Sequence, residues 1–185
     1  MEQVWEGFNL IGKAFVEEPS IWWFLAPVFI LWIGMEIYFG QYKRERLGWN
    51  SILTNGIFFS WINIAAFRVL FMEDMMANDF WLRFGILSVF FIYGMFVIYV
   101  AFFHKISQKT GAALAGPTRI YFLSIVSVFW GQGILIINKW IFLDFLVLYI
   151  VLSLLFWLIR RNLGVLGDVE AVKNGESPVV EDEKI

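Results

Sequence analysis

Four ionisable side chains, Glu36, Arg68, Arg83 and Asp144, interrupt long apolar stretches of this sequence. A charge at the centre of a bilayer costs at least about 2.5–3.5 kcal/mol, so each needs an opposite charge, an aqueous cavity or a route to the interface. Arginines bind carboxylates and phosphates. These side chains are therefore the first place to look for chemistry.

Arg68 and Asp144 are expected at similar depth in the membrane. One interpretation is an ion pair between helices. Another is a pocket for an anionic substrate, surrounded by Arg68, Arg83 and Lys139, in which Asp144 orients one of the bases. Arginine snorkelling to the interface would also explain these residues without a function. We favour a structural role, because nothing in the sequence shows which helix faces meet.

Glu36 lies close to a basic cluster that includes Lys43 and Arg44. A proton-binding or cation-binding carboxylate would have this setting. A glutamate paired with Lys43 or Arg44, one or two turns along the same helix, would have it too, and this interpretation is favoured.

Asn63 and Gln132 complete the candidate intramembrane polar site, which comprises Glu36, Asn63, Arg68, Arg83, Gln132 and Asp144. Gln132 stands between two glycines, Gly131 and Gly133. Glycines at mid-span allow close helix packing. They also occur in locally unwound segments that bind solutes. Packing is the favoured explanation here.

The sequence predicts no catalytic residue, cofactor or metal site. It has no cysteine and one histidine, His104, which cannot assemble a zinc or haem site of the usual kinds. HExxH, GxSxG and P-loop patterns do not occur, and no motif identifies a family. The net charge of −2 gives no reason to expect a nucleic-acid partner.

The apolar segments that would position these side chains indicate a membrane protein. Hydrophobic residues make up 60 % of the chain and charged residues 16 %, against about 45–50 % and 25 % in soluble domains. Five apolar stretches, each near the roughly 20 residues that a helix needs to cross a bilayer, are separated by polar clusters. They cover residues 21–39, 52–72, 80–103, 120–137 and 140–159. The expected fold is an all-α, polytopic bundle of five transmembrane helices.

The two ends of the chain differ from the bundle at 21–161. In residues 1–20, Val4, Phe8, Ile11 and Phe15 recur at helical spacing, which predicts an amphipathic helix on the outer surface or a cap over the bundle. Residues 162–185 carry six acidic and two basic side chains without an apolar face. This composition predicts a disordered acidic cytoplasmic tail.

Basic residues predict the orientation in the membrane. With five crossings, all the clusters beside the spans fall on one side, and cytoplasmic loops are enriched in lysine and arginine. The N-terminus is therefore expected outside and the C-terminus in the cytoplasm, in the plasma membrane. The residues concerned are Lys43, Arg44, Arg46, Lys105, Lys109, Arg119, Arg160 and Arg161.

Three classes of function fit this inventory. A non-catalytic membrane subunit or assembly protein, bound to lipid and to a second copy or another membrane protein, ranks first because the polar inventory is small. A small transporter or channel for an ion or small anionic solute, using Arg68 and Asp144, is the alternative. An intramembrane enzyme ranks third.

Overall fold

The computed structural model describes the chain at residues 2–41, 48–73, 78–135 and 138–173, with side chains at 5–40, 48–72, 78–135 and 138–161. The regular elements in these ranges are all helical. They are α1 (Glu2–Glu17), the 3-10 turn η1 (Pro19–Ile21), α2 (Trp22–Gln41), α3 (Trp49–Glu73), α4 (Phe80–Phe103), α5 (Gln108–Leu114), α6 (Pro117–Gly131) and α7 (Lys139–Lys173).

Five segments of the described chain are long and apolar enough to cross a membrane, which confirms the predicted multi-span α-helical bundle. They are Pro19–Gly40, Trp49–Met72, Phe80–Phe103, Gln108–Gly131 and Lys139–Arg161. Helices are the form that the sequence requires, because hydrocarbon offers no partner to an open backbone amide.

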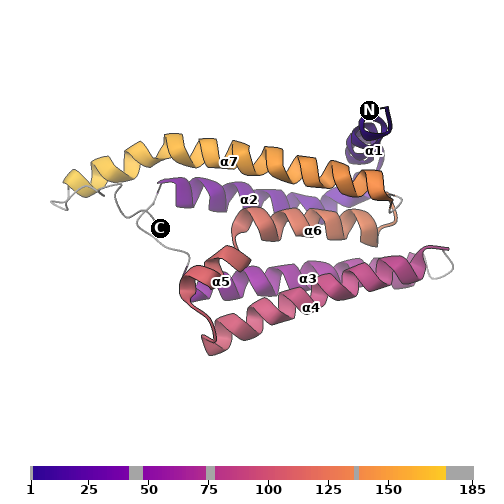
Figure 1. Cartoon of the computed structure of the whole chain (residues 1–185), viewed down its shortest axis with the longest axis horizontal. Helices are drawn as coiled ribbons and strands as arrows, with labels where there is room; N and C mark the ends of the chain where they lie inside the picture. Colours follow the sequence, from indigo (N-terminus) through magenta and orange to yellow (C-terminus); the bar gives the residue numbers. More distant parts are fainter. Residues whose placement is uncertain (1, 42–47, 74–77, 136–137, 174–185) are drawn as a thin grey trace.

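Helix α6 is the centre of the bundle (Figure 1). It packs against α2, α3, α4 and α7, while α3 and α4 form a closely packed hairpin on one side and α2 pairs with α7 on the other. A Cβ atom at Gly94 of α4 would lie 2.5 Å from the Ser60 hydroxyl oxygen of α3, so glycine is what permits this approach. The bundle thus has two layers that meet at α6.

The two ends of the bundle differ in charge. One end, here called the basic end, carries Lys105 just after α4, Lys109 in α5, Arg119 in the first turn of α6, and Arg160 and Arg161 in α7. The opposite end carries the start of α2, the turn before α4 and the junction between α6 and α7. The clustering of basic residues at one end agrees with the sequence pattern.

The predicted boundaries of the fourth span are wrong. The sequence suggested 120–137, but α6 begins at Pro117 and ends at Gly131, and the short helix α5 precedes it. Proline is well suited to the first turn of a helix. Gly133 has a φ of 68°, a left-handed conformation that follows the end of the helix. Gln132 and Gly133 therefore lie in a turn and not at mid-span.

Helix α1 forms a cap at the opposite end of the bundle. A cap was one of the two arrangements that the sequence predicted for this helix. It runs across the direction of the long helices and packs on the start of α7 (Figure 1). Ile11 and Ala14 are buried, while Trp5 is 77 % exposed. The predicted apolar face is confirmed at Ile11, and the side chain of Val4 lies outside the described residues.

The backbone beyond residue 161 is helical where the structure describes it. Helix α7 continues through Lys173, past the expected start of the acidic tail at residue 162. Extending an existing helix adds one hydrogen bond for each residue fixed, which makes continuation cheaper than starting a helix. Residues 174–185 lie outside the described part of the chain.

Candidate functional site

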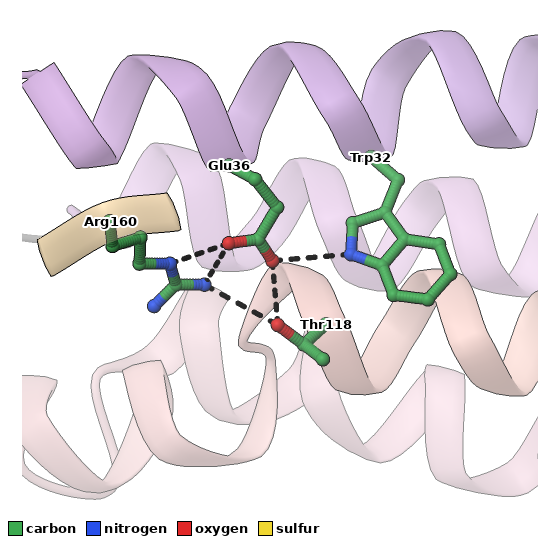
Figure 2. Close-up of polar contacts among 4 residues, drawn as sticks. All are labelled: Trp32, Glu36, Thr118 and Arg160. Atoms are coloured by element: carbon green, nitrogen blue, oxygen red, sulfur yellow. Dashed lines mark hydrogen bonds and ion pairs between the residues drawn. The ribbon is translucent and has the colours of Figure 1, made fainter. Parts of the chain in front are cut away.

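Glu36 is the centre of the largest polar cluster that the side-chain contacts show inside the bundle (Figure 2). Its carboxylate is fully buried. The Thr118 hydroxyl donates to Oε1 over 2.6 Å, and the Trp32 indole N–H donates to the same oxygen over 3.2 Å. Arg160 Nε donates to Oε2, and Arg160 Nη2 forms an ion pair with the same oxygen. The charge of Glu36 is therefore both neutralised and hydrogen-bonded.

Three helices bring this cluster together. Trp32 and Glu36 are four residues apart on α2, which places them on one face. Thr118 belongs to the first turn of α6, and Arg160 lies on α7. Arg160 Nη2 also donates to the Thr118 hydroxyl oxygen over 3.4 Å. Glu36 is thus a junction of α2, α6 and α7.

Glu36 has a partner that the sequence did not predict. The favoured partners, Lys43 and Arg44, lie outside the described residues. Within the described residues, the cation that pairs with Glu36 is Arg160, from the last long helix. Because both carboxylate oxygens accept hydrogen bonds, the arrangement suits a structural tie better than a site that captures a proton or a free cation.

Asn63 is buried and tied to α6. Its side-chain amide donates to the Phe59 carbonyl over 2.8 Å, and its side-chain oxygen accepts from the Ser127 hydroxyl over 3.2 Å. Sequence reasoning missed a second asparagine, Asn55, which has a similar role about two turns earlier on α3. Both residues use their hydrogen bonds within the bundle.

Asn55 hydrogen-bonds to both sides of the break between α5 and α6. Its amide donates to the Ala115 carbonyl over 2.8 Å, and its side-chain oxygen accepts from the Tyr121 hydroxyl over 3.3 Å. The carbonyl at a helix end has no partner within its own helix. Asn55 supplies that partner and so fixes α3 against the start of α6.

The predicted anion pocket is not assembled around Asp144. Arg68 is exposed on α3, and Arg83 of α4 pairs with Asp79, which directly precedes that helix, over 2.8 Å. Lys139 lies 5.3 Å from the centroid of the Trp140 ring. Among the described residues, none of these three bases pairs with Asp144, so the suggested Arg68–Asp144 ion pair is wrong.

Asp144 is instead covered by α1. It is fully buried on α7, and neither carboxylate oxygen has a hydrogen-bond partner in the described part of the chain. A Cβ atom at Gly7 would lie 1.7 Å from Asp144 Oδ2, so the α1 backbone passes directly over the carboxyl group. Burying an ionised carboxylate without a hydrogen-bond donor is costly, which sets Asp144 apart from the paired Glu36.

Two neighbouring cavities lie beside α6. The first, here called the α6 groove, encloses about 400 Å³ and is almost wholly apolar; Phe90, Leu123, Val126 and Phe145 are among its lining residues. The second, here called the arginine cavity, encloses about 350 Å³ at the basic end and is lined by Thr118 and Arg160 among others. Arg119 and Tyr149 line both cavities.

A third cavity lies at the opposite end, where Gln132 is found. It encloses about 360 Å³ and is lined by Glu18, Ser20, Gln132 and Gly133, with apolar neighbours. Gln132 is therefore separate from the Glu36 cluster, at the other end of α6. Within the described residues, no group of three or more histidine and carboxylate side chains is arranged to hold a metal ion.

No protein-family model matches the sequence, and no significant similarity to a curated protein or to a solved structure was found. The geometry divides the predicted polar residues into those that tie helices together, Glu36 and Asn63, and one that is buried without a partner, Asp144.

Proposed function

We propose that this chain is a non-catalytic membrane subunit or assembly protein, which acts by binding other membrane components. The observation that carries the proposal is the use of its buried polar side chains. Glu36, Asn55 and Asn63 each hydrogen-bond to another helix of the bundle. Side chains engaged in this way stabilise the helix arrangement and are poorly suited to accept a substrate.

Native mass spectrometry of the protein released from lipid nanodiscs tests this proposal. We expect a defined homo-oligomer or a retained partner protein. Tagged and untagged copies are co-purified in two experiments, one after co-expression and one after separate expression and mixing. Recovery of the untagged copy after co-expression but not after mixing distinguishes a true oligomer from association after extraction. A lone monomer that retains an ion or a small solute would contradict the proposal.

A small transporter is the second candidate, and Asp144 favours it. A buried carboxyl group without a partner is typical of proton-carrying and ion-carrying sites in membranes. Proteoliposomes with an entrapped pH-sensitive dye test this function. The candidate requires proton flux in the wild type, its loss in Asp144→Asn, and its retention in Glu6→Gln, which removes an exposed carboxylate of α1. No flux in the wild type would eliminate proton transport.

We also propose that the protein lies in the plasma membrane with its N-terminus outside, because the basic end suits the cytoplasm. The chain has no native cysteine, so single cysteines report the topology directly. Asn78→Cys at the opposite end should react with a membrane-impermeant maleimide in intact cells. Lys105→Cys at the basic end should react only after permeabilisation, and the reverse pattern would invert the orientation.

A further inference from the structure

The α6 groove opens sideways toward lipid. Its floor is α6, from Arg119 near the first turn to Trp130 near the last, and α4 and α7 form its sides. Helix α6 lies between α7 and α4 in Figure 1 and contacts both. The lining residues Phe142 and Leu146 of α7 are 62 % and 50 % exposed. A ligand can therefore enter the groove from the bilayer without passing through the bundle.

The basic end of the groove carries the positive charge of Arg119. Arg119 donates to the Ala113 carbonyl and adjoins the Tyr93 hydroxyl, and no carboxylate in the described part of the chain pairs with it. Arg160, in the adjoining arginine cavity, uses Nε and Nη2 on Glu36 and Thr118; its third guanidinium nitrogen makes none of these contacts (Figure 2). Donors remain at this end for an anionic group.

The groove has the length of one lipid leaflet. Arg119 and Trp130 are separated by about 16 Å along the axis of α6, at roughly 1.5 Å per residue. Half of the hydrocarbon core of a bilayer is about 15 Å thick. The lining between these two residues is apolar, and Trp130 keeps a buried indole N–H that has no hydrogen-bond partner among the described residues. An acyl chain fits this depth and this lining.

We propose that the α6 groove and the arginine cavity together bind one anionic phospholipid, with an acyl chain in the groove and the phosphate beside Arg119. Arginine forms paired hydrogen bonds with phosphate oxygens. Basic pockets between transmembrane helices are known to hold anionic head groups. The site depends on the groove and on Arg119, so it stands whether the protein is a subunit or a transporter.

Native mass spectrometry with added phosphatidylglycerol or phosphatidylcholine of identical acyl chains tests the head-group end. We expect phosphatidylglycerol to bind the wild type about tenfold more tightly. The phosphate of either lipid can contact Arg119, but the choline cation of phosphatidylcholine is repelled by the arginines at this end. Arg119→Gln should remove this preference. Lys109→Gln, which removes an exposed charge at the same end, should keep it. Equal binding of the two lipids, or equal losses in both variants, would overturn the proposal.

The acyl-chain end is tested by filling the groove. Leu146→Trp places a large ring at its exposed rim and should reduce retention of phosphatidylglycerol several-fold, while Leu154→Trp on the exposed surface of α7 should not. Because Leu146 is exposed, this variant keeps the test available if Arg119→Gln misfolds. Displacement of the lipid by millimolar inorganic phosphate alone, or unchanged retention in Leu146→Trp, would indicate a free-anion site and reject the lipid.

Discussion

The carboxylate of Glu36 on α2 and the guanidinium of Arg160 on α7 form an ion pair, although 124 residues separate them in the sequence. The Glu36 side chain is almost completely buried, whereas that of Arg160 is 39 % exposed. The carboxylate is thus the member of the pair that depends most on its partner. Removing the arginine leaves a charge inside the bundle, which costs more than the pair itself contributes.

Arg160→Gln should lower the free energy of unfolding by about 2–3 kcal/mol, somewhat less than for a fully buried pair because the arginine is partly exposed. Denaturant-induced unfolding in mixed micelles measures this change. The neighbouring Arg161→Gln, which removes an exposed arginine, should cost no more than about 0.5 kcal/mol. Equal losses in the two variants would show that the ion pair contributes nothing specific.

The pair can also be tested by a double-mutant cycle. Glu36→Gln and Arg160→Gln combined should cost less than the sum of the single changes, with a coupling free energy of about 1 kcal/mol or more. Additive losses would mean that the two residues act independently, despite their contact.

Thr118→Val should destabilise the junction of α2, α6 and α7. The substitution keeps the shape of the side chain but removes the hydroxyl that donates to Glu36 over 2.6 Å. We expect a loss of about 1–3 kcal/mol, typical of a hydrogen bond to a charged group. The control is Thr54→Val, whose exposed hydroxyl bonds to the Asn50 carbonyl of its own helix. A Thr118→Val protein as stable as the control would remove Thr118 from the junction.

Asn55→Leu should weaken the attachment of α3 to the break between α5 and α6. It leaves the carbonyl of the buried residue Ala115 without its side-chain donor, at a cost of about 1–3 kcal/mol. Asn50→Leu, at an exposed position near the start of the same helix, is the matched control. Hydrogen exchange should also quicken at the start of α6 in Asn55→Leu, and unchanged protection there would count against this role.

Gly131→Ala should be destabilising, because its Cβ atom would lie 2.6 Å from the Cβ atom of Ala66. Forcing α3 and α6 apart is expected to cost about 1–3 kcal/mol. At Gly34, a Cβ atom would meet nothing within 4 Å, and Gly34→Ala should stabilise helix α2 by up to about 1 kcal/mol. Thermal denaturation of the two variants in the same detergent compares them, and shifts of the same sign would refute the packing argument.

For Gly131 and Gln132, the sequence predicted the packing role correctly but the position in the helix incorrectly. Close packing, the favoured explanation for the glycines, holds for Gly131, which contacts Ala66. The predicted mid-span position of residues 131–133 is wrong, because α6 begins at Pro117 and ends at Gly131. Apolar composition continues past both helix ends, so hydropathy alone could not locate them. The left-handed conformation of Gly133, which marks the end, is a property of the backbone.

The sequence by itself determined the class of the protein and its five helical spans. Lipid leaves few alternatives, because each apolar stretch must satisfy its own backbone hydrogen bonds and be about 20 residues long. Only the tertiary structure decided that Arg160 pairs with Glu36 and that Asp144 lies beneath Gly7. Such contacts depend on how each helix is rotated about its axis. Spans that are apolar on nearly every face carry too little pattern to specify that rotation.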